Sequence, residues 1–178
     1  MRYFLGFDLT AKNKLAIDAW RNKSLPAFDT SVPVQNFHIT ALFLGQMQPN
    51  QLDCLTRELD SLNHPTFSFQ LNQMGYWSKP KILWLGCTEI PKLAISLYDK
   101  LCDLSKQAGL TIPSREYCPH VTLVRKVTHN PPSALIPPDF EVQIQLLHLF
   151  ESVAGKGGVQ YPIRQSWELQ RTINPKWL

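Results

Sequence analysis

The sequence predicts an α+β protein with mostly antiparallel sheet and helices packed on its outer faces. The chain is 178 residues long, the size of one ordinary domain with a core of its own. Short apolar runs typical of strands alternate with segments of helical periodicity. A His-x-Thr motif also recurs half a chain apart. We therefore expect a single domain over residues 1–178, made of two intertwined, pseudo-symmetric lobes, each with its own sheet, around a central groove.

The first half of the chain alternates strand and helix signals. Thr10 is a suitable N-cap for the first helix, and Pro49 suits the first turn of the second, in which leucines recur at helical spacing. Gly45 follows an apolar run and predicts its end. We expect strands at 3–8, within 32–44 (centred on 37–44), at 66–71 and at 81–86. We also expect helices at 11–24 and 49–62, and a loop at 75–80.

The second half begins with a helix and continues with strands. Gly109 is the expected residue just past the end of that helix. The glycine-rich residues 155–158 lack the G-x-x-x-x-G-K-[ST] pattern of a phosphate-binding loop, so we expect a hairpin turn there. We expect a helix at 91–108, strands at 121–124, 140–151 and 159–169, and a proline-rich loop at 130–138.

The composition excludes several classes of protein. Hydrophobic residues make up 44% of the chain and charged residues 18%, values of a folded protein and not of a disordered one. No apolar run approaches the roughly 18–20 residues of a membrane span, so we expect no membrane partner. The N-terminal residues 1–8 reach an acid early and have no cleavage-site pattern, so we expect mature structure there instead of a signal peptide.

Charge and cysteine usage indicate a cytoplasmic protein that tolerates an anionic ligand. The net charge is +4, compatible with a phosphate-bearing substrate but far from that of a polycation. The four cysteines contain no C-x-x-C pair and no zinc-finger spacing, so we expect reduced, free thiols. Nothing in the sequence demands more than a monomer.

The repeated motif places two histidines and two threonines on expected strands. Because strand side chains alternate, His38 and Thr40 share one face, and His120 and Thr122 do the same on the second strand. Two imidazoles in one groove suit displacement at phosphorus, with one removing a proton from the attacking oxygen and the other protonating the leaving oxygen. The hydroxyls can hydrogen-bond the non-bridging phosphate oxygens.

A single His-x-Thr string carries little information. The chain holds a third copy, His64-Pro65-Thr66, in which the proline marks a turn ahead of a strand. An isolated histidine is more often a surface or core residue than a catalytic one. The functional reading depends on the pairing of two copies, both in apolar runs and half a chain apart.

Residues 37–45 (FHITALFLG) and 119–125 (PHVTLVR) resemble the two H-x-T-x motifs of the 2H phosphoesterase superfamily. Within it, the chain most resembles the LigT-like RNA 2′,3′-cyclic phosphodiesterases, also called 2′-5′ RNA ligases. The resemblance extends nearly from end to end. It includes residues 2–7, 82–86, 150–152 and 167–169, together with Gly158 and Tyr161.

The resemblance implies a bilobal α+β fold with both motifs in a central groove. It implies metal-independent opening of a 2′,3′-cyclic phosphate at an RNA 3′ end to a 2′-phosphomonoester, with no cofactor, and possible 2′-5′ ligation in reverse. By the same resemblance, His38 is the general acid and His120 the general base, and Thr40 and Thr122 hold the phosphate. The residues themselves do not distinguish the two histidines.

Four further residues are candidates for substrate binding, each with a structural alternative. Arg125 suits a phosphate, but regular alternation puts it on the face opposite Thr122, where it would be a solvated charge. Phe7 and Phe43 can stack on a base or pack in the core. Trp77, beside lysines in an expected loop, is a better candidate for base stacking, or it caps a sheet edge.

Two other functions remain open at this stage. A non-catalytic module that binds RNA or nucleotides would use the same groove, but phosphate binding alone does not require a paired acid and base. A metal-dependent hydrolase would need a site such as Cys118, His120 and His38, for which the spacing gives no support. The expected partner is RNA with a 2′,3′-cyclic phosphate end or a cyclic nucleotide.

Overall fold

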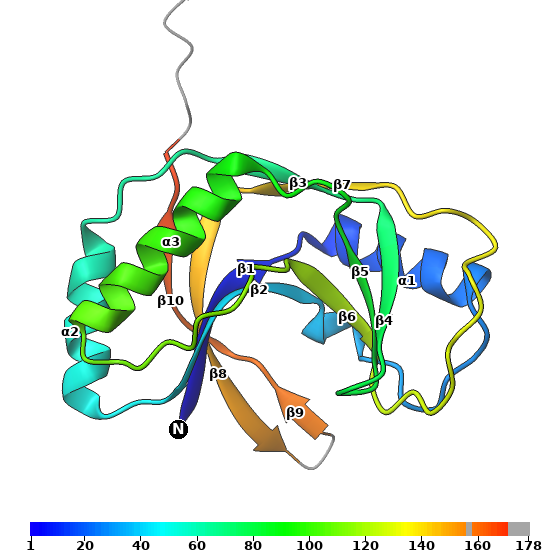
Figure 1. Ribbon diagram of the computed structural model, residues 1–178, viewed down its shortest axis with the longest axis horizontal. Helices are drawn as coiled ribbons and strands as arrows, with labels where there is room; N and C mark the ends of the chain where they lie inside the picture. Colours follow the sequence, from blue (N-terminus) through cyan, green and yellow to red (C-terminus); the bar gives the residue numbers. More distant parts are fainter. Residues whose placement is uncertain (156–157, 171–178) are drawn as a thin grey trace, which may run out of the picture.

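Most strands join one antiparallel sheet in the order β10-β8-β1-β2-β6-β5-β4, with β9 paired to β8 (Figure 1). The separate strands β3 and β7 pair with each other. The computed structural model describes residues 1–155 and 158–170. The strands are β1 (Arg2–Asp8), β2 (His38–Gln46), β3 (Phe67–Leu71), β4 (Gln73–Trp77), β5 (Ile82–Gly86), β6 (His120–Val124), β7 (Phe140–Ile144), β8 (Leu146–Gly155), β9 (Gly158–Gln160) and β10 (Ile163–Glu168). The helices are α1 (Ala11–Ser24), the 3₁₀ helix η1 (Val34–Asn36), α2 (Pro49–Asp60) and α3 (Lys92–Gln107).

The large sheet confirms the expected α+β class and its antiparallel pairing. The two sheets expected from the motif repeat are halves of this one sheet, β10-β8-β1-β2 and β6-β5-β4. The halves join where β2 pairs with β6 and Ile39 lies opposite Val121. The two histidine motifs therefore lie next to each other at the centre of the sheet.

The three expected α-helices are confirmed to within two residues at each end. The Thr10 side chain caps α1 by accepting a hydrogen bond from the backbone N–H of Asn13 at 3.2 Å. Gly109 follows α3 with a φ of +78°, a backbone angle that glycine adopts without strain.

The strand boundaries depart from expectation in the first half of the chain. β2 begins at His38, directly after the turn of η1 and close to the expected start, but it continues past Gly45, where it was expected to end. A strand, β4, replaces the first half of the loop expected at 75–80. Gly75 weakened the strand signal there, but its missing side chain leaves the space that the Trp84 ring of the neighbouring strand occupies.

Two long strands expected in the second half are each divided. The run 140–151 splits at Gln145, because β7 pairs in the small sheet and β8 in the large one. The run 159–169 splits before β10 at Pro162, which lacks the N–H that a sheet ladder needs. Gly155 and Gly158 lie opposite each other in the β8–β9 pair. Two residues of the expected hairpin turn, Lys156 and Gly157, lie outside the described residues.

The helices cover the sheet at different ends. Figure 1 shows α2 and α3 side by side near the β8–β10 end, and α1 toward the β4–β6 end. The buried faces of α2 and α3 carry the regularly spaced leucines, including Leu55, Leu59, Leu97 and Leu101. This packing leaves the other face of the central strands open over the two motifs.

Two further observations concern the cysteines and the length of the helices. All four cysteines are free thiols, as expected from their spacing. No helix in the described part of the chain is long and apolar enough to cross a membrane.

Candidate active site

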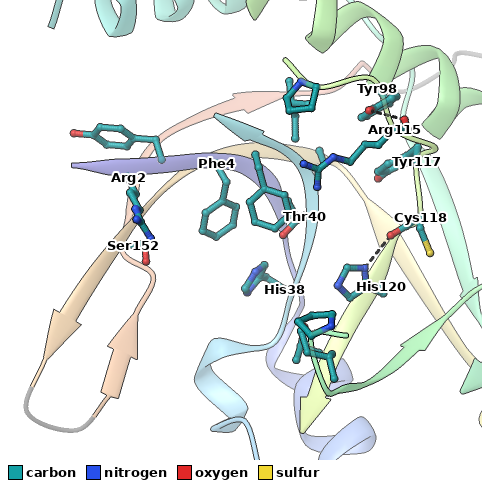
Figure 2. A pocket seen from close by; sticks show the side chains of 18 of the residues that line it. Arg2, Phe4, His38, Thr40, Tyr98, Arg115, Tyr117, Cys118, His120 and Ser152 are labelled. Atoms are coloured by element: carbon teal, nitrogen blue, oxygen red, sulfur yellow. Dashed lines mark hydrogen bonds between the residues drawn. The ribbon is translucent and has the colours of Figure 1, made fainter. Parts of the chain in front are cut away.

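A cavity of about 630 Å³ opens over the centre of the large sheet, where the two lobes meet. Figure 2 shows His38 and His120 facing each other across its floor. The walls come from the start of β1, from β2, from the β4–β5 turn and from the segment that leads into β6. Every substrate-site residue expected from the sequence except Phe7 lines this cavity: His38, Thr40, Phe43, Trp77, His120, Thr122 and Arg125.

The two histidines occupy equivalent positions. Each is the first residue of its strand, β2 or β6. Because Ile39 lies opposite Val121 in an antiparallel pair, His38 falls opposite Thr122 and His120 opposite Thr40. The four side chains therefore form a square on one face, with the histidines on its diagonal.

Each imidazole is oriented by the backbone just before its strand. Nδ1 of His38 lies 2.7 Å from the carbonyl oxygen of Asn36, and Nδ1 of His120 lies 2.8 Å from that of Cys118. A carbonyl oxygen only accepts, so Nδ1 carries the proton and donates it. In the neutral ring, Nε2 is then the unprotonated nitrogen of each histidine, available to take up a proton.

The segments that carry these two carbonyls are held in place by side-chain hydrogen bonds. The Lys14 side chain donates to the carbonyl oxygen of Gln35 at 3.2 Å, and the Asn36 side chain donates to that of Val159 at 2.8 Å. On the other side, the Tyr98 hydroxyl donates to the carbonyl oxygen of Arg115 at 3.2 Å. The segments that orient the histidines are thus fixed by side chains from elsewhere in the fold.

Aromatic rings surround His38 and set its charge. The Phe4 and Tyr161 ring centres each lie 4.9 Å from that of the imidazole, and the Phe150 centre lies 5.7 Å away. Burial lowers the pKa of His38 from 6.5 to about 4, against the opposing effect of the Asn36 carbonyl. The charge that His120 carries when protonated and the charge of Arg125 lower this pKa further, and Asp8 raises it. His38 is therefore neutral at pH 7 in the ligand-free protein.

His120 has a corresponding environment built from tryptophan. The Trp77 ring meets it edge to face with centres 4.7 Å apart, and Trp84 stands 5.0 Å behind Trp77. Burial lowers the pKa of His120 as well; the Cys118 carbonyl opposes this, and the charge of Arg125 adds to it. Two neutral imidazoles with depressed pKa values thus face one cavity.

Irregular pairing brings Phe43 and Arg125 into this cavity. In β2 the register against β1 shifts between Leu5 and Gly6, so that Ala41 is bulged. In β6 the register against β5 shifts in the same way and bulges Leu123. Each bulge reverses the alternation beyond it. Arg125 therefore lines the cavity, although regular alternation predicted the opposite face.

Comparison with known proteins agrees with this geometry. The family model described as "2'-5' RNA ligase superfamily" matches residues 9–156. The chain belongs to the 2′-5′ RNA ligase superfamily.

One relative matches nearly the whole chain, and another matches about seven tenths of it. The RNA 2′,3′-cyclic phosphodiesterase of Escherichia coli (strain K12) is 26% identical over 172 residues, covering 94% of this chain and 96% of its own. That of Bacillus subtilis (strain 168) is 30% identical over 136 residues, covering 71% and 72%. The crystal structure of E. coli LigT in apo form superimposes with a TM-score of 0.86 at 26% identity, over 96% of this chain and 98% of that one. The complex of E. coli LigT with 3′-AMP gives 0.87.

Phe7 was expected to bind substrate, and this prediction is wrong. Phe7 is 1% exposed and packs against Phe67 and Phe69 of the small sheet, with ring centres 5.8 and 6.0 Å away. It lies on the core face of β1, whereas Phe4 lies on the cavity face. The apolar run 3–7 hides which face is buried. The polar Asp8, which shares the Phe4 face by alternation, was the signal that could have separated them.

Trp77 is correctly placed in the cavity, but for a different reason from the one expected. It ends strand β4 instead of lying in a loop, and its ring packs between His120 and Trp84. Sequence reasoning gave no role to Trp84, Phe4 or Arg115. Trp84 falls directly opposite Thr122 in the β5–β6 pair, a relationship that required the register to be known.

The metal-dependent alternative has no support in the structure. Within residues 1–155 and 158–170, no group of three or more His, Cys, Asp and Glu side chains is placed to hold a metal ion. The Cys118 thiol has its pKa raised by burial, which disfavours the thiolate that a zinc ion requires.

Proposed function

We propose that this protein opens 2′,3′-cyclic phosphodiesters at RNA 3′ ends to 2′-phosphomonoesters by acid–base catalysis between His38 and His120. One observation carries the proposal. The two imidazoles lie on the diagonal of one strand pair, and each has Nδ1 bound to a backbone carbonyl, which leaves its Nε2 for the reaction. This arrangement supports the transfer of one proton in and one proton out across a phosphorus atom held between them.

The proposed step uses one water molecule and no other reactant. Nε2 of His120 takes a proton from water while the water oxygen bonds to phosphorus. The bond from phosphorus to O3′ breaks, and protonated His38 gives its Nε2 proton to O3′. The products are a 2′-phosphomonoester and a 3′-hydroxyl, with the proton now on His120. The assignment of acid and base follows the superfamily. The same step with an RNA 5′-hydroxyl in place of water forms a 2′-5′ phosphodiester and a 3′-hydroxyl, which is 2′-5′ ligation.

The low pKa of His38 fits an acid that forms only with substrate present. Burial holds the pKa of His38 at about 4 in the ligand-free protein, so the proton needed for catalysis is absent at neutral pH. A bound cyclic phosphate brings a negative charge next to the ring and favours the imidazolium. Proton uptake by His38 then accompanies substrate binding.

The remaining cavity residues have roles consistent with a nucleotide. We propose that Thr40, Thr122 and Arg125 bind the non-bridging phosphate oxygens, whose charge is redistributed in the transition state. Phe43, exposed by 56% within the cavity, is the proposed stacking surface for the base. Trp77, packed against His120, offers a second aromatic wall.

The proposal includes the setting in which the protein works. The partner is RNA with a 2′,3′-cyclic phosphate end or a cyclic nucleotide, bound by a monomer. The four free cysteines support a reducing compartment such as the cytoplasm.

The test is to incubate the protein, in excess EDTA, with an oligoribonucleotide that ends in a 2′,3′-cyclic phosphate and to identify the product. We expect complete conversion to the 2′-phosphate, distinguished from the 3′-phosphate by its chromatographic mobility. Tight binding without conversion would instead identify a binding module. Conversion that appears only after zinc or magnesium is restored would refute the two-histidine mechanism.

A further inference from the structure

The cavity carries more positive charge than one cyclic phosphate requires. Three arginines line it, Arg2, Arg115 and Arg125, and among the described residues Glu116 is the only acidic side chain in its walls. The ion pairs found in the described part of the chain involve none of these three arginines. A cyclic phosphodiester bears a single negative charge. At least one of these cations is therefore available for a second anionic group.

The three arginines divide between two regions of the cavity. Arg125 belongs to the reacting end, because its charge lowers the pKa of both His38 and His120. Arg2 begins β1 at the end opposite Asp8, which pairs with His38, and Arg115 lies in the segment five residues before His120. Figure 2 shows Arg115 extending into the cavity from the wall that precedes His120, with Arg2 beside Ser152 on the opposite side.

Arg115 is the better anchored of these two outer cations. Its carbonyl oxygen accepts a hydrogen bond from the Tyr98 hydroxyl, and the Tyr98 ring stacks on Tyr117 with centres 4.7 Å apart and planes 10° from parallel. Cys118, which follows Tyr117, accepts the hydrogen bond from Nδ1 of His120 with its backbone carbonyl. The segment that orients His120 therefore also fixes where the Arg115 guanidinium enters the cavity.

The covalent structure of an RNA 3′ end determines where its next phosphate lies relative to the cyclic phosphate. A 2′,3′-cyclic phosphate occupies both O2′ and O3′ of the last ribose, so the rest of the chain continues only from its 5′ oxygen. The next phosphate thus lies on the far side of that ribose from the reacting phosphorus. With the cyclic phosphate between the histidines and the base against Phe43, this phosphate points toward the outer part of the cavity.

We propose that Arg115 binds the phosphodiester on the 5′ side of the reacting nucleotide and so makes RNA of two or more nucleotides the preferred substrate over a cyclic mononucleotide. This inference rests on the proposed function and names its substrate class. A guanidinium presents paired N–H donors that match two phosphate oxygens, and such charge-assisted bonds are stronger than neutral ones.

The test compares adenosine 2′,3′-cyclic phosphate with the dinucleotide that carries one more adenosine on its 5′ oxygen. We expect the wild-type protein to favour the dinucleotide in kcat/KM, and Arg115→Met to reduce that preference about tenfold, the scale of a lost hydrogen bond to a charged group. Arg115→Lys should restore part of it, because the ammonium keeps the charge without the paired donors. The control is Arg57→Met on α2, an exposed arginine outside the cavity, which removes the same charge from the protein.

The outcomes separate this inference from the proposed function. Equal preference in wild-type and Arg115→Met protein, or no preference in the wild type, would overturn the inference while hydrolysis of the mononucleotide stood. A third substrate, adenosine 2′,3′-cyclic phosphate with a 5′-phosphomonoester, tests the kind of phosphate. If it is favoured and the dinucleotide is not, Arg115 serves a terminal phosphate and the phosphodiester assignment is wrong. Failure to open any of the three would instead refute the proposed function.

Discussion

Phe43 and Arg125 occupy equivalent positions in the two halves of the sheet. Each lies five residues after the histidine of its strand, each follows a bulge, and each is exposed in the same cavity. The burial patterns of the two strands match residue by residue up to these positions. One fold element, used twice, thus supplies an aromatic surface on one side of the histidines and a cation on the other.

This equivalence makes Arg125→Gln an informative variant. Removing the cation should lower kcat/KM for a cyclic phosphate end by about tenfold or more, because hydrogen bonds between charged groups are among the stronger ones. The pKa values of His38 and His120 should both rise, since the charge of Arg125 lowers them. NMR titration of the imidazole protons measures both. His38 should nevertheless remain well below 6.5, because burial is the larger cause; unchanged pKa values in the variant would contradict this account.

The two histidines themselves should be indispensable. His38→Ala and His120→Ala should each lower turnover by at least about 100-fold, the scale of a lost general acid or base, while affinity for the substrate changes much less. Single-turnover kinetics and binding measured separately distinguish the two effects. His129→Gln, an exposed histidine outside the cavity, is the matched control. Near wild-type turnover in either alanine variant would remove that residue from the mechanism.

Sequence patterns predicted which side chains of the two motifs share a face, and for a physical reason. His38, Thr40, His120 and Thr122 lie on short stretches where simple alternation holds, so spacing alone puts each pair on one face. Apolar periodicity likewise located the helices. The end-to-end resemblance to a known superfamily put both motifs in one groove, but the pairing of β2 with β6, which joins the two halves into one sheet, was not predicted.

The remainder depended on long-range register. A bulge at Leu123 cannot be read from the letters around it, and it alone turns Arg125 into the cavity. The choice between Phe4 and Phe7 required knowing which face of β1 meets the small sheet. The lowered pKa values of the two histidines could not be predicted from the motifs either. Part of the burial that lowers these pKa values comes from aromatic rings far away in the sequence, such as Tyr161 beside His38 and Trp77 beside His120.

The pH dependence follows from these lowered pKa values. One histidine must be protonated and the other neutral, and kcat/KM reports the ligand-free protein. The profile of kcat/KM against pH should therefore be bell-shaped. One limb should lie near pH 4, from His38, and the other below pH 6.5, from His120. The maximum of kcat/KM then lies on the acidic side of pH 6.5. In the complex, the phosphate charge raises both pKa values, and the kcat profile should move to higher pH. Rates with a cyclic-phosphate oligonucleotide from pH 3.5 to 9 test this, and a flat kcat/KM profile or one centred at neutrality would contradict it.

The packing behind His120 gives a prediction far from the reacting atoms. A Cβ added at Gly75 would lie 2.1 Å from Cζ2 of Trp84, and Trp84 supports the Trp77 ring that contacts His120. Gly75→Ala should therefore displace both indoles, destabilise the protein by about 1–3 kcal/mol and lower kcat in the folded fraction. The control is Gly109→Ala, whose φ of +78° costs an alanine about 1–2 kcal/mol at the end of α3, away from the cavity. Thermal unfolding and turnover, measured on both variants, separate stability from positioning. If the two lose activity only in proportion to unfolding, Trp84 has no part in orienting His120.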